Sequence, residues 1–207
     1  MSTFPPPAHT TFIDSQTCRS LRTACLGEMH ARRFYLQAAR KMEAASLHVI
    51  AHALHFTAAQ EKEHADIFRG LIIAHGGPAV PMVEDAPVLL PHTPLKILLS
   101  VARSEQDEGD ALYPQCARVA AQEGYPRIAE AFRRVAETER CHARRFRQYA
   151  AALSNGTLFR DSGCVSWICL SCGQLHSGVE APDCCSGCGK DQGHFIRSNF
   201  YPFIIED

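Results

Sequence analysis

Side chains that can bind metal ions recur at helical spacing along most of this sequence. In three places two such residues stand three apart, so that both share one face of a helix. Carboxylates and imidazoles rarely lie in a helical core unless they are paired or bind a metal, because burying a bare charge is very costly. The pattern predicts a buried metal site whose ligands are Glu28, Glu61, His64, Glu105, Glu108, Glu139 and His142.

Six of these seven residues match the ligands of a pair of iron ions. A di-iron site in a helical bundle takes one glutamate from each of two helices and a Glu-x-x-His pair from each of the other two. Here Glu28 and Glu105 are the single glutamates, residues 61/64 and 139/142 are the pairs, and Glu108 is additional. One Glu-x-x-His pair alone would more commonly lie on a solvated helix face. In this sequence the ligands stand in stripes that are otherwise apolar.

Four amphipathic helices must position these ligands. Apolar residues recur in steps of three and four through four segments, which is the period of a helix with one buried face. Capping residues, proline and glycine mark the ends of these segments. The predicted helices begin at about Thr17, at a Ser46 cap, at Pro94 and at Pro126, and the last three end at Gly76, Gly124 and Asn155.

An internal repeat relates the two halves of this helical region. Glu61 and His64 are echoed by Glu139 and His142, and each pair follows a single glutamate at a similar distance. The proline-rich residues 78–93 are too many for a tight hairpin turn, so we expect them to cross along the bundle. Two similar hairpins with one long connection predict a ferritin-like four-helix bundle.

Cysteine replaces helical periodicity after Thr157, where short β-type runs also appear. Two C-x-x-C pairs, each followed by glycine, are typical of four thiolates around one zinc or iron ion. Cys164 and Cys184 fall outside this spacing and are expected to be spectators. A small domain of this kind needs the metal because it buries little core. The predicted ligands are Cys169, Cys172, Cys185 and Cys188.

Composition restricts the classes of partner. A formal net charge of −1 argues against nucleic acid or an anionic membrane as the main partner, and no stretch reaches the length of a membrane span. The first residues have neither a basic start nor an apolar signal core, so we expect a cytoplasmic protein. We predict an N-terminal arm (1–16), a bundle (17–156) and a small β-rich domain (157–207). The histidines His48, His52 and His55 are expected on a solvated or subunit-contact face.

The motifs around the predicted ligands resemble those of the rubrerythrin family. The bundle of that family is similar in the Glu-x-x-His pairs and in Tyr113-Pro114, five residues after Glu108. Its rubredoxin-like domain is similar in Trp167-x-Cys169 and in the second C-x-x-C pair. The similarity covers about residues 17–200. It implies a non-haem di-iron peroxidase that reduces hydrogen peroxide to water, with electrons from NAD(P)H.

The resemblance also implies roles for individual residues. By position, Glu61 and Glu139 would bridge the irons and Glu28 would bind the first of them. The first iron would exchange Glu108 for His64 on reduction.

The same resemblance implies the remaining ligands and partners. Glu105 and His142 would bind the second iron, and Tyr35 and Tyr113 match tyrosines that surround the ligands. With Glu108 and His64, these tyrosines are the expected catalytic residues. A reductase or rubredoxin would donate electrons to a four-cysteine iron, and relay between subunits implies a homodimer.

Two other functions use the same residues. A ferritin-like ferroxidase or iron store would employ the bundle ligands, although storage does not require an electron-carrying domain. A structural or regulatory zinc-ribbon protein would hold zinc in the four-cysteine site. The residue types leave iron, zinc and manganese open as the metals that are loaded.

Overall fold

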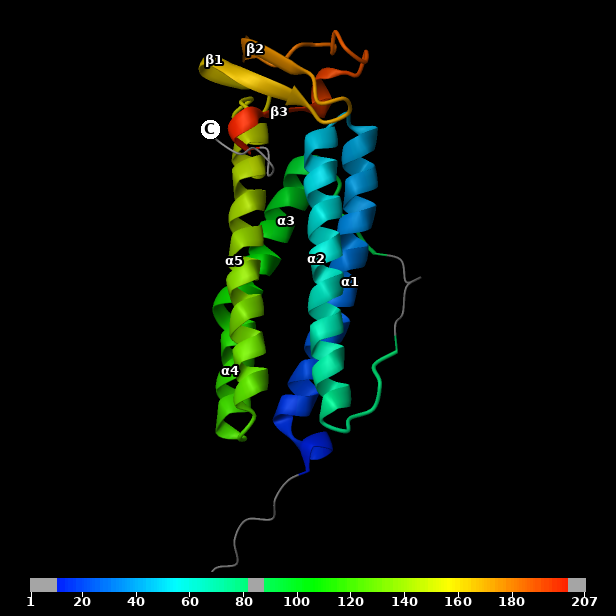
Figure 1. Ribbon diagram of the computed structural model, residues 1–207, viewed down its shortest axis with the longest axis vertical. Coiled ribbons are helices and arrows are strands. Elements are labelled where there is room, and N and C mark those ends of the chain that lie inside the picture. The colour runs from blue at the N-terminus through cyan, green and yellow to red at the C-terminus, as the bar shows by residue number, and fades with distance from the viewer. Residues whose placement is uncertain (1–10, 82–87, 201–207) are drawn as a thin grey trace, which may run out of the picture.

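Two long helical hairpins lie side by side, and a small sheet covers one end of them (Figure 1). The computed structural model describes residues 11–81 and 88–200. The first hairpin is α1 (Gln16–Ala44) with α2 (His48–Ala74). The second pairs α5 (Pro126–Ser154) with a helix built from α3 (Pro94–Asp107), the π-helical turn η2 (Glu108–Leu112) and α4 (Tyr113–Gln122). In the described part of the chain, none of the helices is long and apolar enough to cross a membrane.

Most predicted helix ends are confirmed. Thr93 caps α3 by accepting a hydrogen bond from the backbone of Lys96, and Pro94 occupies the first turn. Gly76 and Gly124 follow α2 and α4 with φ angles of +76° and +86°, a region that glycine enters without a Cβ penalty. The described parts of the connection after α2, residues 75–81 and 88–93, lie along the bundle as expected (Figure 1), and residues 82–87 between them lie outside the described part.

The predicted Ser46 cap is wrong. The residue at the N-cap of α2 is Leu47, and Ser46 has a φ of +53°. The chain therefore turns sharply at Ser46 between α1 and α2, in a left-handed conformation that non-glycine residues adopt at a cost. A serine in this conformation cannot also act as the cap of the next helix.

The sequence pattern predicts one continuous third helix, but the structure interrupts this helix. Residues Glu108–Leu112 form a π-helical turn, which shifts the register of everything after it. At Gly109 this turn lies close to α5, where Arg140 donates a hydrogen bond to the Gly109 carbonyl. Glycine permits that close approach, and Glu108 is the first residue of the turn.

The core of the bundle is divided into two apolar clusters. One contains Phe68 and Phe132, and the other contains Leu54 and Phe146, all of them fully buried. The predicted ligands Glu61 and Glu139 lie between these clusters in sequence on α2 and α5. Apolar packing on both sides fixes the helices that carry the ligands, and it excludes water from the layer between them.

The C-terminal domain is a three-stranded antiparallel sheet made of β1 (Arg160–Cys169), β2 (Leu175–Glu180) and β3 (Phe195–Arg197). The strands lie in the order β2-β1-β3, with β1 in the centre. Trp167 is fully buried and donates a hydrogen bond to the Gly178 carbonyl. Its described buried core is Trp167, Cys169, Ala181, Cys185 and Phe195. So few apolar residues cannot stabilise a fold unaided, which agrees with the expected metal. The ferritin-like bundle with a small β-rich domain is thus confirmed.

The C-terminal domain contacts the turn between α1 and α2. There His48 stacks on His194, with ring centroids 3.7 Å apart. The expectation that His48 lies on a solvated or subunit-contact face is therefore wrong, because the small domain of the same chain covers it.

Candidate metal centres

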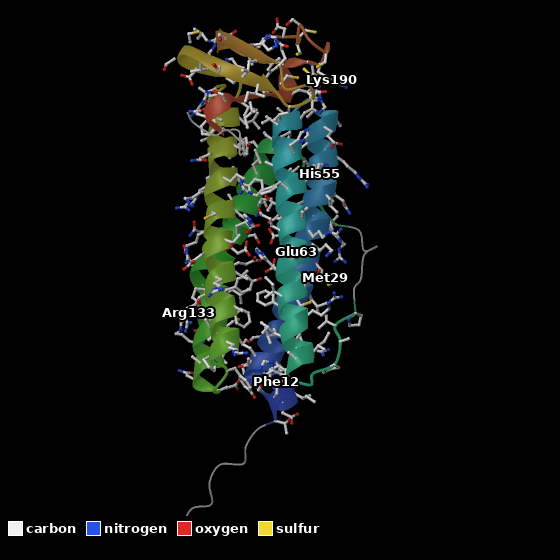
Figure 2. All side chains as sticks on the ribbon, in the orientation of Figure 1. Phe12, Met29, His55, Glu63, Arg133 and Lys190 are labelled. Carbon is white, nitrogen blue, oxygen red and sulfur yellow. The ribbon has the colours of Figure 1, made fainter. Side chains whose placement is uncertain are left out.

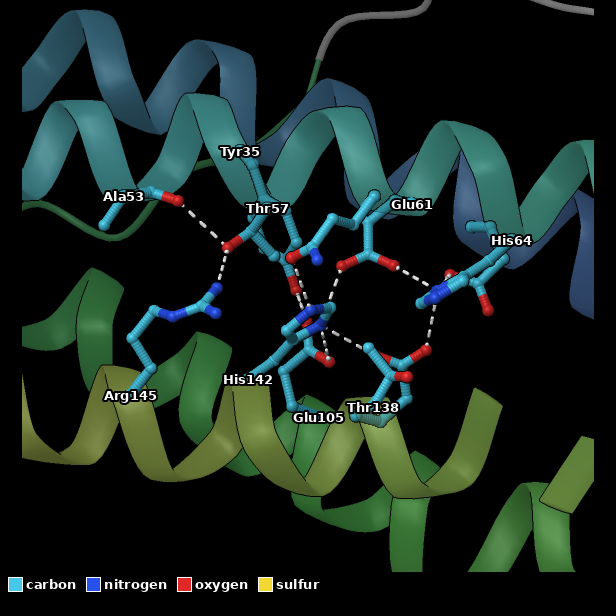
Figure 3. A network of polar contacts seen from close by, with 12 residues as sticks. Tyr35, Ala53, Thr57, Glu61, His64, Glu105, Thr138, His142 and Arg145 are labelled. Carbon is cyan, nitrogen blue, oxygen red and sulfur yellow. Dashed lines mark hydrogen bonds and ion pairs between the residues drawn. The ribbon is translucent and has the colours of Figure 1, made fainter. Parts of the chain in front are cut away.

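Four helices bring six of the seven predicted ligands into one buried layer (Figure 3). Hydrophobic positions above and below each ligand orient its helix, so the Glu-x-x-His pairs of α2 and α5 point at each other. No residue in the layer is more than 7% exposed. The six residues are Glu28, Glu61, His64, Glu105, Glu139 and His142.

The ligand atoms form two overlapping groups, and within each group all atoms lie within 4.8 Å of one another. One group is Glu28, Glu61, His64 and Glu139. The other is Glu61, Glu105, Glu139 and His142. Two carboxylates, Glu61 and Glu139, belong to both groups. This is the arrangement that two neighbouring cations with shared bridging carboxylates require.

Close contacts without hydrogen bonds fit this interpretation. Oε1 of Glu139 lies 2.9 Å from Nδ1 of His64, and Oε2 lies 2.8 Å from Nδ1 of His142. Both oxygens and the His142 nitrogen nevertheless lack a hydrogen-bond partner among the described residues. Buried polar atoms left in this way are costly. Metal ions would satisfy them together, so the donor set fits a pair of cations.

The electrostatics of the layer also call for positive charge. Burial raises the pKa of Glu28 and of Glu105 well above the ordinary value, and neighbouring carboxylates raise it further. Burial lowers the pKa of His64, but its close contacts with Glu139, Glu28 and Glu61 prevail and raise it to about 12. Protons and metal ions compete for the same atoms, so metal binding here releases protons.

Three side chains around the ligands hold them in place. The hydroxyls of Tyr35 and Tyr113 donate hydrogen bonds to Glu105 and Glu28 respectively, as the resemblance had placed these tyrosines. Gln60, which the sequence reasoning missed, has its Oε1 3.0 Å from Nε2 of His142. That bond leaves the Nδ1 of His142 as the ligand atom. Glutamine is polar and does not stand out in the apolar pattern of a helix. The only hint in the sequence is that Gln60 adjoins the predicted ligand Glu61.

Glu108 differs from the other six ligands. It is half-buried and belongs to neither group of converging atoms. Burial and the nearby carboxylates of Glu139 and Glu61 raise its pKa to about 7. A surface hollow lies against it, lined by Ser104, Asp107, Glu108, Ala111, Leu112 and Gln115. The π-helical turn therefore places one carboxylate between the buried layer and solvent.

The four cysteines of the C-terminal domain have the geometry of a single-ion site. The Sγ atoms of Cys169 and Cys188 are 3.7 Å apart, as are those of Cys172 and Cys185. A tetrahedron with metal–sulfur bonds of about 2.3 Å has edges of about 3.8 Å, so the four atoms fit one zinc or iron ion. His176 lies beside them, with Nε2 3.6 Å from the Cys185 sulfur.

Glycines and the spare cysteines complete this picture. Gly173 and Gly189 have φ angles of +77° and +73°, which lets the backbone turn toward the sulfurs after each C-x-x-C pair. Cys164 and Cys184 are exposed and stand outside the converging group, as predicted. All ten cysteines lie within the described residues, and none of them forms a disulfide bond.

Both domains match known family models. The model of rubrerythrin matches residues 20–150, and the model of the rubrerythrin rubredoxin-like domain matches residues 167–196. A rubrerythrin of Clostridium perfringens is 35% identical over 182 residues, which cover 87% of this chain and 93% of that protein. A rubrerythrin of Nitratidesulfovibrio vulgaris is 31% identical with the same coverage.

Solved structures share the fold. Nigerythrin in its fully reduced, all-ferrous state superposes with a TM-score of 0.62 at 24% identity, covering 95% of this chain and 98% of that one. A bacterioferritin of Desulfovibrio desulfuricans gives 0.63 at 22% identity, covering 69% and 82%. The family models span most of the two domains, and the relatives retain over 30% identity along nearly their whole length. This chain belongs to the rubrerythrin family.

Proposed function

We propose that this protein reduces hydrogen peroxide to water as a di-iron peroxidase, with electrons that originate on NAD(P)H. A reductase or rubredoxin would deliver them to iron in the four-cysteine site. The observation that carries this function is the position of Glu108, a seventh carboxylate on the π-helical turn between the buried ligands and a surface hollow. Storage of iron requires neither this carboxylate nor an electron-carrying domain in the same chain.

The buried residues divide the task of holding the metals. Glu61 and Glu139 would be shared by two ions, because they belong to both ligand groups. Glu28 would hold one of these ions together with His64 or Glu108, the pair that the family resemblance implies. The iron pair, when bound, supplies the two electrons that peroxide reduction consumes.

Glu105 and His142, which complete the other ligand group, would hold the second ion. Tyr35 and Gln60 orient these two ligands through hydrogen bonds, and a ligand whose orientation is fixed in advance costs less to order when the metal binds.

Protons must reach the oxygen atoms as the electrons do, because each peroxide takes up two protons and two electrons to give two waters. Glu108 is suited to deliver one, since burial raises the pKa of its carboxyl and so favours the protonated form. A general acid works best when its pKa lies near the working pH. The hollow beside Glu108 gives it access to solvent for reprotonation.

Electrons would pass between two copies of the chain. His48 begins α2 at the end of the bundle that the C-terminal domain covers, whereas Glu61 lies about 20 Å further along α2 at the rise of an α-helix. Electron tunnelling falls off exponentially with distance, so the path within one chain is unfavourable. A homodimer that places the four-cysteine site of one subunit beside the bundle of the other would shorten it.

The test compares two variants with matched controls in the iron-loaded protein supplied with NADPH, a rubredoxin reductase and rubredoxin. Glu108→Ala is expected to lower peroxide turnover by about 100-fold or more, which is the usual contribution of a general acid. Its control is Glu137→Ala, which removes an exposed carboxylate of α5 that does not line the hollow. Cys172→Ser is expected to abolish NADPH-dependent turnover, while the chemically reduced variant still consumes peroxide. Its control is Cys184→Ser.

The proposed activity is wrong if Glu108→Ala and Cys172→Ser both keep full NADPH-dependent turnover. An iron store would behave differently. It would take up many ferrous ions per chain in the presence of oxygen, and its uptake would be insensitive to Cys172→Ser.

A further inference from the structure

A second cluster of metal-binding side chains lies where the C-terminal domain meets the bundle. Figure 2 shows His55 on the upper part of α2 and Lys190 in the domain above it. His48 begins α2, and Asp191 follows Lys190. The cluster consists of His48, Asp191 and His194, each of which presents one nitrogen or oxygen within 4.8 Å of the other two.

Both histidines face the same carboxylate oxygen. Nδ1 of His194 lies 2.9 Å and Nε2 of His48 lies 3.8 Å from Oδ1 of Asp191. The two rings stack with an interplanar angle of 26°. The side chain of His48 is 22% exposed and that of His194 is 13% exposed. The three groups are thus partly shielded, while the carboxylate keeps access to solvent.

The backbone around the cluster is fixed on both sides. Asp191 caps the short helix η3 (Gln192–His194) by accepting a hydrogen bond from the amide of Gly193. A Cβ on Gly193 would overlap the carbonyl of Ser46, so the two chain segments are in direct contact there. The left-handed Ser46 turn and a glycine opposite it therefore bring Asp191 and His194 onto His48.

A further histidine, His52, lies one helical turn from His48 on α2. Burial lowers the pKa of the neighbouring His52, and the positive charges of His55, His194 and His48 lower it further. Neutral imidazole and ionised carboxylate are the forms that bind metal.

We propose that His48, Asp191 and His194 bind one divalent cation of the zinc type, which fixes the C-terminal domain to the α1–α2 turn. Two imidazoles and a carboxylate with open positions form a donor set that such cations accept. The site is separate from the buried ligands, because His64 lies about 24 Å along α2 from His48. It does not depend on the proposed peroxidase activity.

The experiment uses the full-length protein with its iron sites loaded, dialysed against buffered Zn²⁺ and then analysed for zinc and iron. We expect one zinc per chain in addition to the iron. His48→Ala and His194→Ala should each weaken this zinc binding by at least about 10-fold to 100-fold, because losing even a residue that only orients a metal ligand costs that much. The matched control is His30→Ala, an exposed histidine on α1, which should leave it unchanged.

Folding of each variant is checked by the visible absorption of the four-cysteine iron, and His48→Gln provides a second variant that keeps side-chain volume. The proposed site is refuted if no additional zinc binds at micromolar concentration. It is also refuted if zinc binds with equal affinity in wild type, His48→Ala and His194→Ala, or if it binds only by releasing iron.

Discussion

Replacing Gly109 with alanine should push the π-helical turn away from α5. A Cβ at this position would lie 2.9 Å from Cγ of Arg140, 3.0 Å from the carbonyl oxygen of Ala136 and 3.1 Å from the backbone nitrogen of Arg140. Two of these three atoms belong to the backbone of α5 and cannot rotate aside. The turn that carries Glu108 must therefore move, or α5 must.

The size of the effect follows from two opposing contributions. Forcing an extra methyl group into a packed contact costs about 1–3 kcal/mol. Alanine regains up to about 1 kcal/mol over glycine from its helix propensity. Taking the middle of the first range and the whole of the second contribution, the net loss of unfolding free energy is about 1 kcal/mol, which lowers the Tm of a chain this long by roughly 2–4 °C.

The control is another helical glycine with free space around it. Gly70 is exposed on α2, and no described atom outside its own helix backbone and chain neighbours lies within 4 Å of a Cβ built there. Gly70→Ala should stabilise the protein by up to about 1 kcal/mol. We therefore expect the Tm shifts of the two variants to have opposite signs. Thermal unfolding of both iron-loaded variants, followed by circular dichroism at one scan rate, measures them.

Peroxide turnover gives a second readout, because only Gly109→Ala displaces Glu108. We expect its turnover to fall and that of Gly70→Ala to remain at the wild-type level. Equal Tm shifts in the two variants, or a rise in Tm for Gly109→Ala, would refute the reasoning about the contact with α5.

Two further predictions concern the ends of the molecule. Glu123 accepts hydrogen bonds from the backbone and hydroxyl of Thr17 at the start of α1, and although partial burial raises its pKa, these bonds lower it overall. Its contribution is thus present above the ordinary glutamate pKa of 4.5 and is lost as pH falls through the folded value. Glu123→Gln should lower stability by about 0.5–1 kcal/mol at neutral pH. Tm measured over a pH series should show this difference vanish in acid, and a constant difference would contradict it. Removing the four-cysteine metal with a chelator should expose Trp167, the single tryptophan, because the small core cannot persist alone. A red shift of its fluorescence with unchanged helix content checks this, and an unshifted spectrum would show that the domain folds without metal.

The sequence by itself determined the architecture and the residue types at the metal sites. Helical periodicity places Glu61 and His64 on one buried face whatever lies opposite, because both belong to one helix. The C-x-x-C pairs are equally local, since the four sulfurs come from two short turns. The repeat of the Glu-x-x-His pair predicted two similar helical hairpins and hence a ferritin-like bundle, and the structure confirms this fold.

Other features required partners from distant segments. The prediction of one continuous third helix failed because the π-helical turn at Glu108 is packed against α5 through Gly109, and periodicity contains no record of that contact. Gln60 was missed for the same reason, since its importance comes from His142 on another helix.

The ends of the helices show the same division. Gly76 could be identified as a stop because a positive φ is a property of one residue. Whether His48 faces solvent was decided only when the C-terminal domain folded back on the α1–α2 turn and placed His194 against it. Local conformation and residue spacing are encoded along the chain, whereas contacts between elements depend on distances that only the packed structure sets.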